Sequence, residues 1–209
     1  MTRKTAPHCI TLIGMMGSGK TLVGRALARR LGWSFIDLDE RISQEQGRSI
    51  PEIFAAEGEA AFRALELRTL SSILSPLSPA APRPIPLPPK TRTSVVETSA
   101  AAPGPIEETS LCSTVLSLGG GTILQPECAA LVCAHSLCIR LTASVETLCE
   151  RLRADRNRPL LQGGQPLEDR IAQLLSERES AYAAAAHITI PTDAHTPDDI
   201  IAQLLSLLR

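Results

Sequence analysis

The sequence predicts an α/β fold in which a central parallel sheet of about five strands has helices on both faces. Short apolar, β-branched runs alternate with longer stretches of helix-forming residues along most of the 209-residue chain. Such an alternation implies βαβ crossovers, which bring parallel strands together. Nine of the 16 prolines fall between residues 76 and 105. The remaining sequence, about 170 residues, is the size of one compact domain.

The runs expected to form strands are short and rich in aliphatic and β-branched residues, as buried parallel strands require. They are Cys9–Ile13, Ser34–Asp37, Thr114–Leu118, Leu137–Leu141 and His187–Ile190.

The expected helices carry recognisable start and stop signals. Lys20–Leu31 has an apolar stripe and is followed by Gly32, a residue suited to a left-handed helix terminus. Ser49, Pro51 and Glu52 form an N-cap, a first-turn proline and a capping-box acid. The helix that they start is expected to break near Gly58 and to resume over Glu59–Leu74, and the others to span Pro126–Ala134, Ser144–Leu152, Leu167–Ala186 and the segment from Pro197 onward.

Residues 75–110 stand apart because nine of these 36 residues are proline. Runs such as PRPIPLPPK favour polyproline II and cannot continue a helix or a central strand. We expect a flexible insert in a single domain spanning 1–209. The fold should tolerate it, because each doubling of loop length costs only about 0.6 kcal/mol in closure entropy. The alternative is a PxxP-type docking site for a partner protein.

Composition excludes several classes of partner. The 21 basic and 22 acidic residues give a net charge of −1, so no overall basic field attracts nucleic acid or an anionic membrane. Five aromatic residues are too few for a base-stacking platform. No apolar run approaches the ~20 residues that span a bilayer. Met1–Cys9 lacks the apolar centre of a secretory signal, so we expect a cytoplasmic protein, with a plastid as the alternative for a plant or algal source.

The six cysteines show neither a CxxC pair nor a zinc-ligand spacing. We expect reduced thiols that act as small buried hydrophobes, with a metal site as the alternative.

Gly14–Thr21, with the sequence GMMGSGKT, matches the phosphate-loop pattern G-x-x-x-x-G-K-[ST] between a predicted strand and a predicted helix. Glycines let backbone N–H groups turn toward phosphate oxygens, and the helix N-terminus adds partial positive charge. Lys20 can reach the β- and γ-phosphates, and the Thr21 hydroxyl can ligate Mg²⁺. The loop predicts binding of a nucleotide such as ATP; the alternative is a glycine-rich turn with an incidental Lys-Thr pair.

Three further features lie where ligands bind in parallel α/β sheets, beyond the carboxyl ends of the strands. Asp37 and Asp39 end the second expected strand, and Gly119–Gly121 end the third. Arg63 lies on the helix that follows the second strand and could point back across the opening. Each feature alone is common in turns, loops or solvated helix faces.

In combination the motifs follow a specific order. Along the chain come GMMGSGKT, FIDLDERI, GRSIPEIFAAEGEAAFRALE, LSLGGG, RPLL and LLSERESAY. The chain closely resembles shikimate kinases, small P-loop kinases related in fold to nucleoside monophosphate kinases. The resemblance covers almost all of residues 9–209 except the proline-rich insert. It implies a three-layer P-loop kinase fold with a mobile lid at about 153–166.

The resemblance implies an acceptor site for shikimate. Asp39 matches the residue that grips shikimate hydroxyls, and it is placed to orient or deprotonate the attacking 3-hydroxyl. Arg63 and Arg178 match the two arginines that hold the shikimate carboxylate, a group that the arginine fork can bond bidentately. Gly120 and Gly121 match backbone contacts to the same substrate.

The resemblance also implies how ATP and Mg²⁺ are held. Asp37 matches a carboxylate that assists Mg²⁺ through water, beside Thr21. Arg158 of RPLL matches the lid arginine that meets the transferring phosphoryl group. Arg151 and Pro197 match positions that sandwich the adenine ring. The expected ATP-binding residues are Gly17, Ser18, Gly19, Lys20, Thr21, Leu22, Arg151, Arg158 and Pro197.

The expected reaction is in-line transfer of the ATP γ-phosphoryl group to the 3-hydroxyl of shikimate, with Lys20, Asp39 and Arg158 as catalytic residues. One alternative is another small-molecule P-loop kinase, such as a gluconate or nucleoside monophosphate kinase. A neutral polyol would not require two arginines, and a nucleotide acceptor would need a larger pocket. The other alternative is a catalytically silent nucleotide-binding relative.

Tyr182 is expected to belong to a helix face and the core. The chain is expected to be a monomer.

Overall fold

A parallel sheet of five strands forms the centre of the molecule. The computed structural model of the chain describes residues 8–74, 113–153 and 165–208. The strands lie in the order β2-β3-β1-β4-β5, and each neighbouring pair is parallel, as the alternation predicted. They are β1 (Cys9–Ile13), β2 (Ser34–Asp37), β3 (Thr114–Ser117), β4 (Leu137–Thr142) and β5 (Ile188–Pro191).

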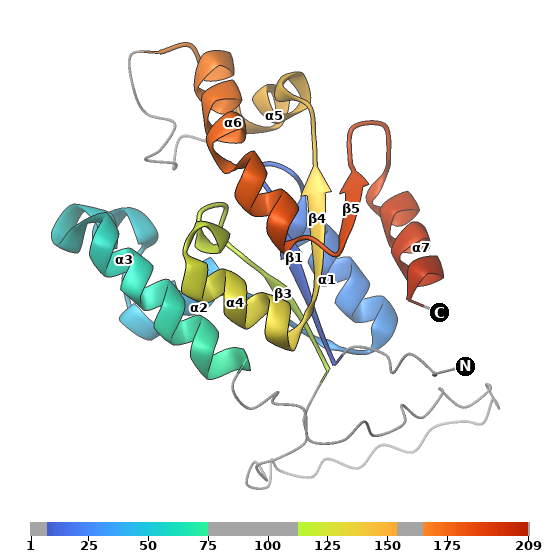
Figure 1. The fold of residues 1–209 in the computed structure, drawn as a ribbon, viewed down its shortest axis with the longest axis horizontal. Helices are drawn as coiled ribbons and strands as arrows, with labels where there is room; N and C mark the ends of the chain where they lie inside the picture. Colours follow the sequence, from blue (N-terminus) through green and yellow to red (C-terminus); the bar gives the residue numbers. More distant parts are fainter. Residues whose placement is uncertain (1–7, 75–112, 154–164, 209) are drawn as a thin grey trace, which may run out of the picture.

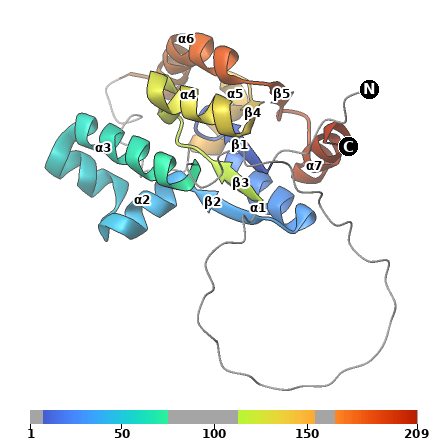
Figure 2. The same ribbon diagram turned by 60° about the horizontal axis from the view of Figure 1, so that its bottom comes forward.

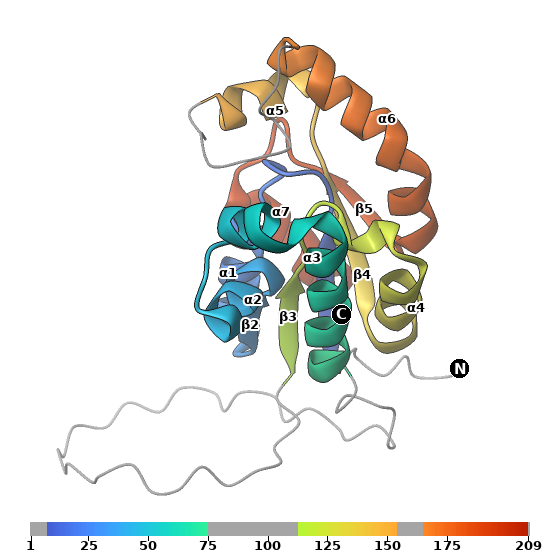
Figure 3. The same cartoon turned by 90° about the vertical axis from the view of Figure 1, so that its left-hand side faces the viewer.

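Helices cover both faces of this sheet, so the predicted three-layer architecture is confirmed (Figures 1 and 2). In the described residues they are α1 (Lys20–Leu31), α2 (Leu38–Gln46), α3 (Ile50–Leu74), α4 (Pro126–His135), α5 (Val145–Leu152), α6 (Leu167–Ala185) and α7 (Pro197–Leu207), with a 3₁₀ turn, η2, at Thr122–Leu124. Figure 3 shows α5 and the first part of α6 above the carboxyl ends of the strands. These strand ends are where the predicted ligand-binding motifs lie.

Strand β1 is buried on both sides because its residues alternate between two cores. Ile10 and Leu12 pack with α1 and α7, whereas Cys9 and Ile13 pack with α2, α3, α4 and α6. A third cluster joins Met15, from the loop after β1, to apolar residues of α5 and α6. The phosphate loop is therefore packed against two helices as well as connected to the sheet.

Helix α3 changes direction at Gly58, as the sequence predicted. This residue has φ 80° and ψ 176°, a backbone conformation that essentially only glycine adopts. The predicted capping box at its start is also present. The Ser49 N–H donates to Glu52 Oε2 at 2.7 Å, and the Glu52 N–H donates to Ser49 Oγ at 3.4 Å.

Helix α2 was not among the predicted elements. It begins because the Asp37 side chain acts as its N-cap: Oδ1 accepts from the N–H groups of Asp39 and Glu40, at 3.2 and 3.4 Å. It ends at Gly47, which has φ 61°. Asp37 is therefore the cap of this helix, and Asp39 lies in its first turn. Other element boundaries differ from the predicted ones by a residue or so, as is usual for frayed ends.

Two predicted segments fall largely outside the description. The whole proline-rich insert at 75–110 and residues 154–164 of the predicted lid lie outside the described residues. None of the helices in the described ranges is long and apolar enough to cross a membrane.

Three cysteine thiols are buried, as expected. Burial raises the pKa of Cys9 to about 11 and the pKa values of Cys128 and Cys138 to about 12. The expectation is wrong for Cys133, which is exposed on α4, and Cys149 is half-buried. In the described ranges all five cysteines are free thiols, and no group of three or more His, Cys, Asp or Glu side chains could hold a metal ion.

These thiols should differ sharply in reactivity, because the thiolate is the nucleophile. In the folded protein at pH 8, iodoacetamide is expected to alkylate Cys133 at least about tenfold faster than Cys9, Cys128 or Cys138. Peptide mass spectrometry measures each rate, and the same reaction in urea is the control in which the four rates converge. Fast labelling of Cys138 in the folded protein would contradict the packing of β4 against α4 and α6.

Candidate active site

Lys20 ties together the loop that connects β1 to α1. Its Nζ donates to the carbonyl oxygens of Gly14 and Met15, both at 2.9 Å, and the residue is only 8% exposed. Gly14 lets this loop cross β4 closely, because a Cβ there would lie 2.2 Å from the Leu141 carbonyl oxygen. The ammonium group therefore lies inside the loop, at the N-terminus of α1, where the helix dipole favours an anion.

Thr21 and Asp37, the two predicted metal residues, lie in contact. Thr21 Oγ1 donates to Asp37 Oδ2 at 2.8 Å, while the other carboxylate oxygen caps α2. A hydroxyl and a carboxylate side by side fit Mg²⁺, a hard cation that takes few protein oxygens and keeps several waters. A cavity of about 440 Å³ lies beside them and is bordered by the predicted loop residues Gly17, Gly19, Lys20, Thr21 and Leu22.

Arg151 links the phosphate loop to the segment that follows β5. From α5 its Nη1 donates to the Gly17 carbonyl oxygen at 3.2 Å and to Thr192 Oγ1 at 3.0 Å. Its Nη2 donates to the Thr192 carbonyl oxygen at 3.0 Å. The segment that begins at Thr192 leads to Pro197, the first residue of α7. Arg151, one of the two residues predicted to sandwich the adenine ring, therefore bonds the segment that leads to the other, Pro197. Arg158 lies outside the described residues.

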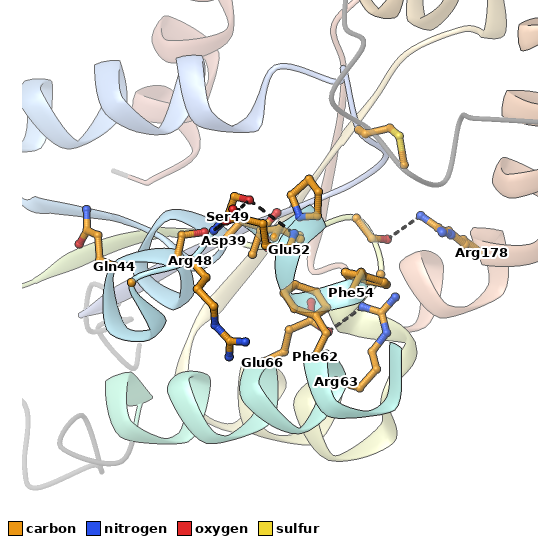
Figure 4. A pocket seen from close by; sticks show the side chains of 18 residues that line it. Asp39, Gln44, Arg48, Ser49, Glu52, Phe54, Phe62, Arg63, Glu66 and Arg178 are labelled. Carbon is orange, nitrogen blue, oxygen red and sulfur yellow. Dashed lines mark hydrogen bonds and ion pairs between the residues drawn. The ribbon is translucent and has the colours of Figure 1, made fainter. Parts of the chain in front are cut away.

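A second cavity, of about 960 Å³, opens beside the first (Figure 4). Its lining includes every predicted acceptor residue: Asp39, Arg63, Gly120, Gly121 and Arg178. In Figure 4 Arg63 and Arg178 approach it from α3 and α6. Asp39 borders both cavities, together with Met16 and the first two residues of the glycine run. The carboxylate of Asp39 therefore lies at the junction between the phosphate loop and the second cavity.

The glycine run after β3 brings bare backbone against three charged side chains. A Cβ on Gly119 would lie 2.8 Å from Asp39 Oδ1, and a Cβ on Gly121 would lie 2.7 Å from Arg63 Nη2. At Gly120 the nearest side-chain atom is Arg178 Nη1, at 3.4 Å. The sequence placed the whole run at the ligand-binding end of the sheet, but the family resemblance implied substrate contacts for Gly120 and Gly121 and not for Gly119.

Arg63 is held by two carboxylates that the sequence analysis did not single out. Its Nη1 donates to Glu66 Oε2 at 2.6 Å, and its Nε and Nη2 donate to Glu59 Oε1 at 3.2 and 2.8 Å. Burial alone would lower the pKa of Arg63, but the two carboxylates outweigh it, and the pKa is raised. Glu59 lies four residues before Arg63 and Glu66 three residues after it on the same helix. This spacing is the signal in the sequence from which the two ion pairs could have been predicted.

Glu66 is a completely buried carboxylate. Besides Arg63 it accepts hydrogen bonds from Thr122 Oγ1 and from Gln125 Nε2, the latter at 3.0 Å. These partners lie on or next to η2, so the carboxylate connects α3 to the turn that follows the glycine run. A buried charge needs this degree of pairing.

Arg178 enters the cavity from α6 and is 5% exposed. Its Nη1 donates to the Gly120 carbonyl oxygen at 3.2 Å, and the hydroxyl of Tyr182 donates to the same oxygen at 2.6 Å. Tyr182 is buried, as predicted, but its hydroxyl also reaches the cavity lining. Phe54 and Phe62 form an aromatic wall with ring centroids 4.8 Å apart, which the sequence analysis had left out of the site.

A parallel sheet with a phosphate loop after its first strand, and beside that loop a second cavity lined by Asp39, Arg63 and Arg178, defines the class of small-molecule P-loop kinases. The family model for shikimate kinase matches residues 16–77 and 106–209, on both sides of the proline-rich run. The chain belongs to the shikimate kinase family.

Individual relatives agree with this assignment. The chain is 37% identical to the shikimate kinase of Thermosynechococcus vestitus, over 95% of this chain and 88% of that protein. It is 36% identical to that of Geobacter metallireducens, over 96% and 91%. Among solved structures, shikimate kinase from Acinetobacter baumannii in complex with shikimate superposes with a TM-score of 0.76 at 32% identity, over 98% of this chain and 94% of that one.

Substitution of the glycine run should separate acceptor binding from ATP binding. Gly121→Ala is expected to displace the Arg63 guanidinium and to raise the acceptor KM about tenfold or more, the effect of losing a charge-assisted hydrogen bond. The melting temperature should fall by a few degrees, because the displaced guanidinium weakens its ion pair with the buried Glu66, while the KM for ATP stays within about twofold. Gly120→Ala, whose Cβ would be at an ordinary contact distance, is the matched control and should have a clearly smaller effect. Equal effects of the two substitutions would contradict this geometry.

Proposed function

We propose that the chain transfers the γ-phosphoryl group of ATP to the 3-hydroxyl of shikimate, giving shikimate 3-phosphate and ADP. The observation that carries this proposal is the second cavity, where two arginines from different helices and one carboxylate surround the bare backbone of a glycine run. Two guanidinium groups suit an acceptor with a carboxylate, and Asp39 suits one with hydroxyls. The relatives named shikimate kinase, and the solved complex of one of them with shikimate, support this choice.

Arg63 has hydrogen-bonding capacity left for such a carboxylate. A guanidinium carries five N–H groups. Glu59 takes the Nε–H and one N–H of Nη2, and Glu66 takes one N–H of Nη1. One N–H remains on each terminal nitrogen, and both nitrogens lie close to Gly121 in the cavity wall. The two glutamates thus fix the guanidinium beside the cavity and leave these two N–H groups for the acceptor. Arg178 is proposed to bind the same carboxylate from the side of α6.

Asp39 is proposed to hold the shikimate hydroxyls and to orient the attacking 3-hydroxyl, because it lies between the two cavities. Backbone N–H groups of the phosphate loop and Lys20 are proposed to receive the ATP phosphates. Thr21 and Asp37 would hold Mg²⁺, which supplies neutralisation of charge on the β- and γ-phosphate oxygens when bound. Arg158 is proposed to meet the transferring phosphoryl group, and Arg151 and Pro197 to hold the adenine ring.

We propose that the chain acts as a cytoplasmic monomer. Among the described residues the large apolar side chains that are exposed are Leu22, Leu124 and Leu207. They lie on three different elements, α1, η2 and α7, whereas interaction surfaces are contiguous apolar patches.

A coupled assay of ADP release tests the reaction. With ATP, Mg²⁺ and shikimate the protein should turn over, and each ADP formed should be matched by one shikimate 3-phosphate detected by mass spectrometry. Gluconate and a nucleoside monophosphate, offered in the same assay, are the comparison acceptors and should be turned over at least about a hundredfold more slowly. If the folded, ATP-binding protein gives no product with shikimate, the proposal is wrong.

Arg63→Lys tests the proposed acceptor site. Lysine keeps the positive charge but acts as a point charge in place of a planar fork. We expect the KM for shikimate to rise about tenfold or more, while the KM for ATP stays within about twofold. Steady-state kinetics with each substrate varied in turn provides both values. Equal losses for the two substrates would show that Arg63 has a structural role instead.

A further inference from the structure

Arg140 is a charged residue in the middle of a buried strand. It lies on β4, which pairs with β1 on one side and β5 on the other, and its neighbours Ile139 and Leu141 are completely buried. Arg140 itself is 8% exposed. Burying a cation is costly unless it is well paired, so its presence here requires an explanation that the proposed reaction does not supply.

The guanidinium of Arg140 is directed at two residues of α6. Its Nη1 and Nη2 donate to the two carboxylate oxygens of Glu179, at 2.7 and 2.5 Å. Its Cζ lies 5.3 Å from the centroid of the Tyr182 ring, in cation–π contact. The ion pair with Glu179 therefore holds the charge over the aromatic face.

Tyr182 connects this buried cation to the acceptor cavity. Its hydroxyl donates at 2.6 Å to the carbonyl oxygen of Gly120, the oxygen to which Arg178 also donates. Arg178 lies one helical turn before Tyr182 on α6, and both Arg178 and Gly120 line the cavity. A continuous series of contacts thus runs from Arg140 through the phenol to the glycine run and the substrate arginine.

The phenol of Tyr182 is suited to act as a permanent hydrogen-bond donor to the Gly120 carbonyl oxygen. Burial raises the pKa of Tyr182, with the charges of Arg178 and Arg140 acting in the opposite direction. The phenol therefore stays protonated at neutral pH and can donate. A cation over the ring draws electron density from it and makes the hydroxyl a stronger hydrogen-bond donor.

We propose that Tyr182 and Arg140 are positioning residues for the acceptor: they fix the Gly120 carbonyl, and with it the Arg178 guanidinium, in the geometry that receives the acceptor carboxylate. Tyr182 acts directly on the carbonyl, and Arg140 acts through the ring of Tyr182. The inference rests on the proposed function in that this cavity takes the acceptor.

Kinetics of Tyr182→Phe, Arg140→Met and the double variant test the arrangement. Tyr182→Phe removes the hydroxyl but keeps the ring, and we expect the KM for shikimate to rise about fivefold, with kcat and the KM for ATP within about twofold. Arg140→Met should raise the same KM about threefold, and Arg140→Lys, which keeps a cation, should raise it less. Glu179 is 57% exposed, so it stays hydrated when Arg140 is replaced.

The double variant should resemble Tyr182→Phe alone, because Arg140 acts through the phenol. Arg25→Met is the matched control: Arg25 also pairs with a glutamate and lies over a ring, that of Phe35 at 4.9 Å, but this ring has no hydroxyl that could bond the glycine run. Its KM for shikimate should equal that of the unmodified protein. Multiplying effects in the double variant, or equal rises in both KM values, would overturn the inference, as would a lower melting temperature with both KM values unchanged.

A second measurement needs no acceptor. Tyr182 is the one tyrosine of the chain, so absorbance near 295 nm follows its ionisation alone. In Arg140→Met the phenol should ionise at higher pH than in the unmodified protein, and in Arg25→Met at the same pH. An unchanged titration in Arg140→Met would overturn the inference whatever the acceptor is. Failure of the unmodified protein to phosphorylate shikimate would refute the proposed function, and this titration would still decide whether Arg140 acts on Tyr182.

Discussion

The site depends on the close approach of charged side chains to backbone that has no Cβ atoms. At the end of β3 three consecutive glycines each meet one such side chain, Asp39, Arg178 or Arg63, and two of the three positions have no room for a methyl group. Charged groups this near the interior need partners. Glu59 and Glu66 supply them for Arg63, and the Gly120 carbonyl accepts from Arg178. Much of the surrounding structure, from the buried Glu66 to the phenol of Tyr182, serves to satisfy this requirement.

The two cavities lie at the carboxyl ends of the same strands and share α6, but their other supports differ. The phosphate loop is fixed by β1, by the apolar contacts of Met15 with α5 and α6, and by Arg151. The second cavity is fixed by α2, α3 and α6, with η2 bonded to Glu66. They meet at Asp39 and the start of the glycine run.

The sequence predicted the fold and the membership of the site well, because both depend on local patterns. Buried parallel strands are continuous apolar runs, and the phosphate loop has a spacing that tolerates little variation. Helix α2 was missed because Asp37 was interpreted as a ligand alone, although Oδ1 of the same carboxylate caps a helix. The signals for that helix, an Asp before it and Gly47 after it, were present in the sequence.

The partners of the site residues could not be predicted in this way. Glu66 and Gln125 meet although they are 59 residues apart, and Tyr182 and Gly120 are 62 residues apart. Only the packing of α3 and α6 around η2 brings them together. The contact of Arg140 could not be predicted either. A single charge within the apolar run of β4 does not indicate that it lies over the ring of Tyr182.

The break at Gly58 divides α3 into two parts that contribute different residues to the site. The part before it carries Pro51 and Phe54 of the cavity wall, and the part after it carries Phe62, which completes the aromatic wall, and Arg63. Because a glycine-only backbone conformation joins them, the first part can change in sequence without altering the register of the second. Selection, or a protein engineer, could reshape the wall for a different ring or side group while the grip on a carboxylate is retained. Residues 50–57 are in this sense the part of the wall open to such redesign, and residues 59–74 carry the ion pairs that hold Arg63.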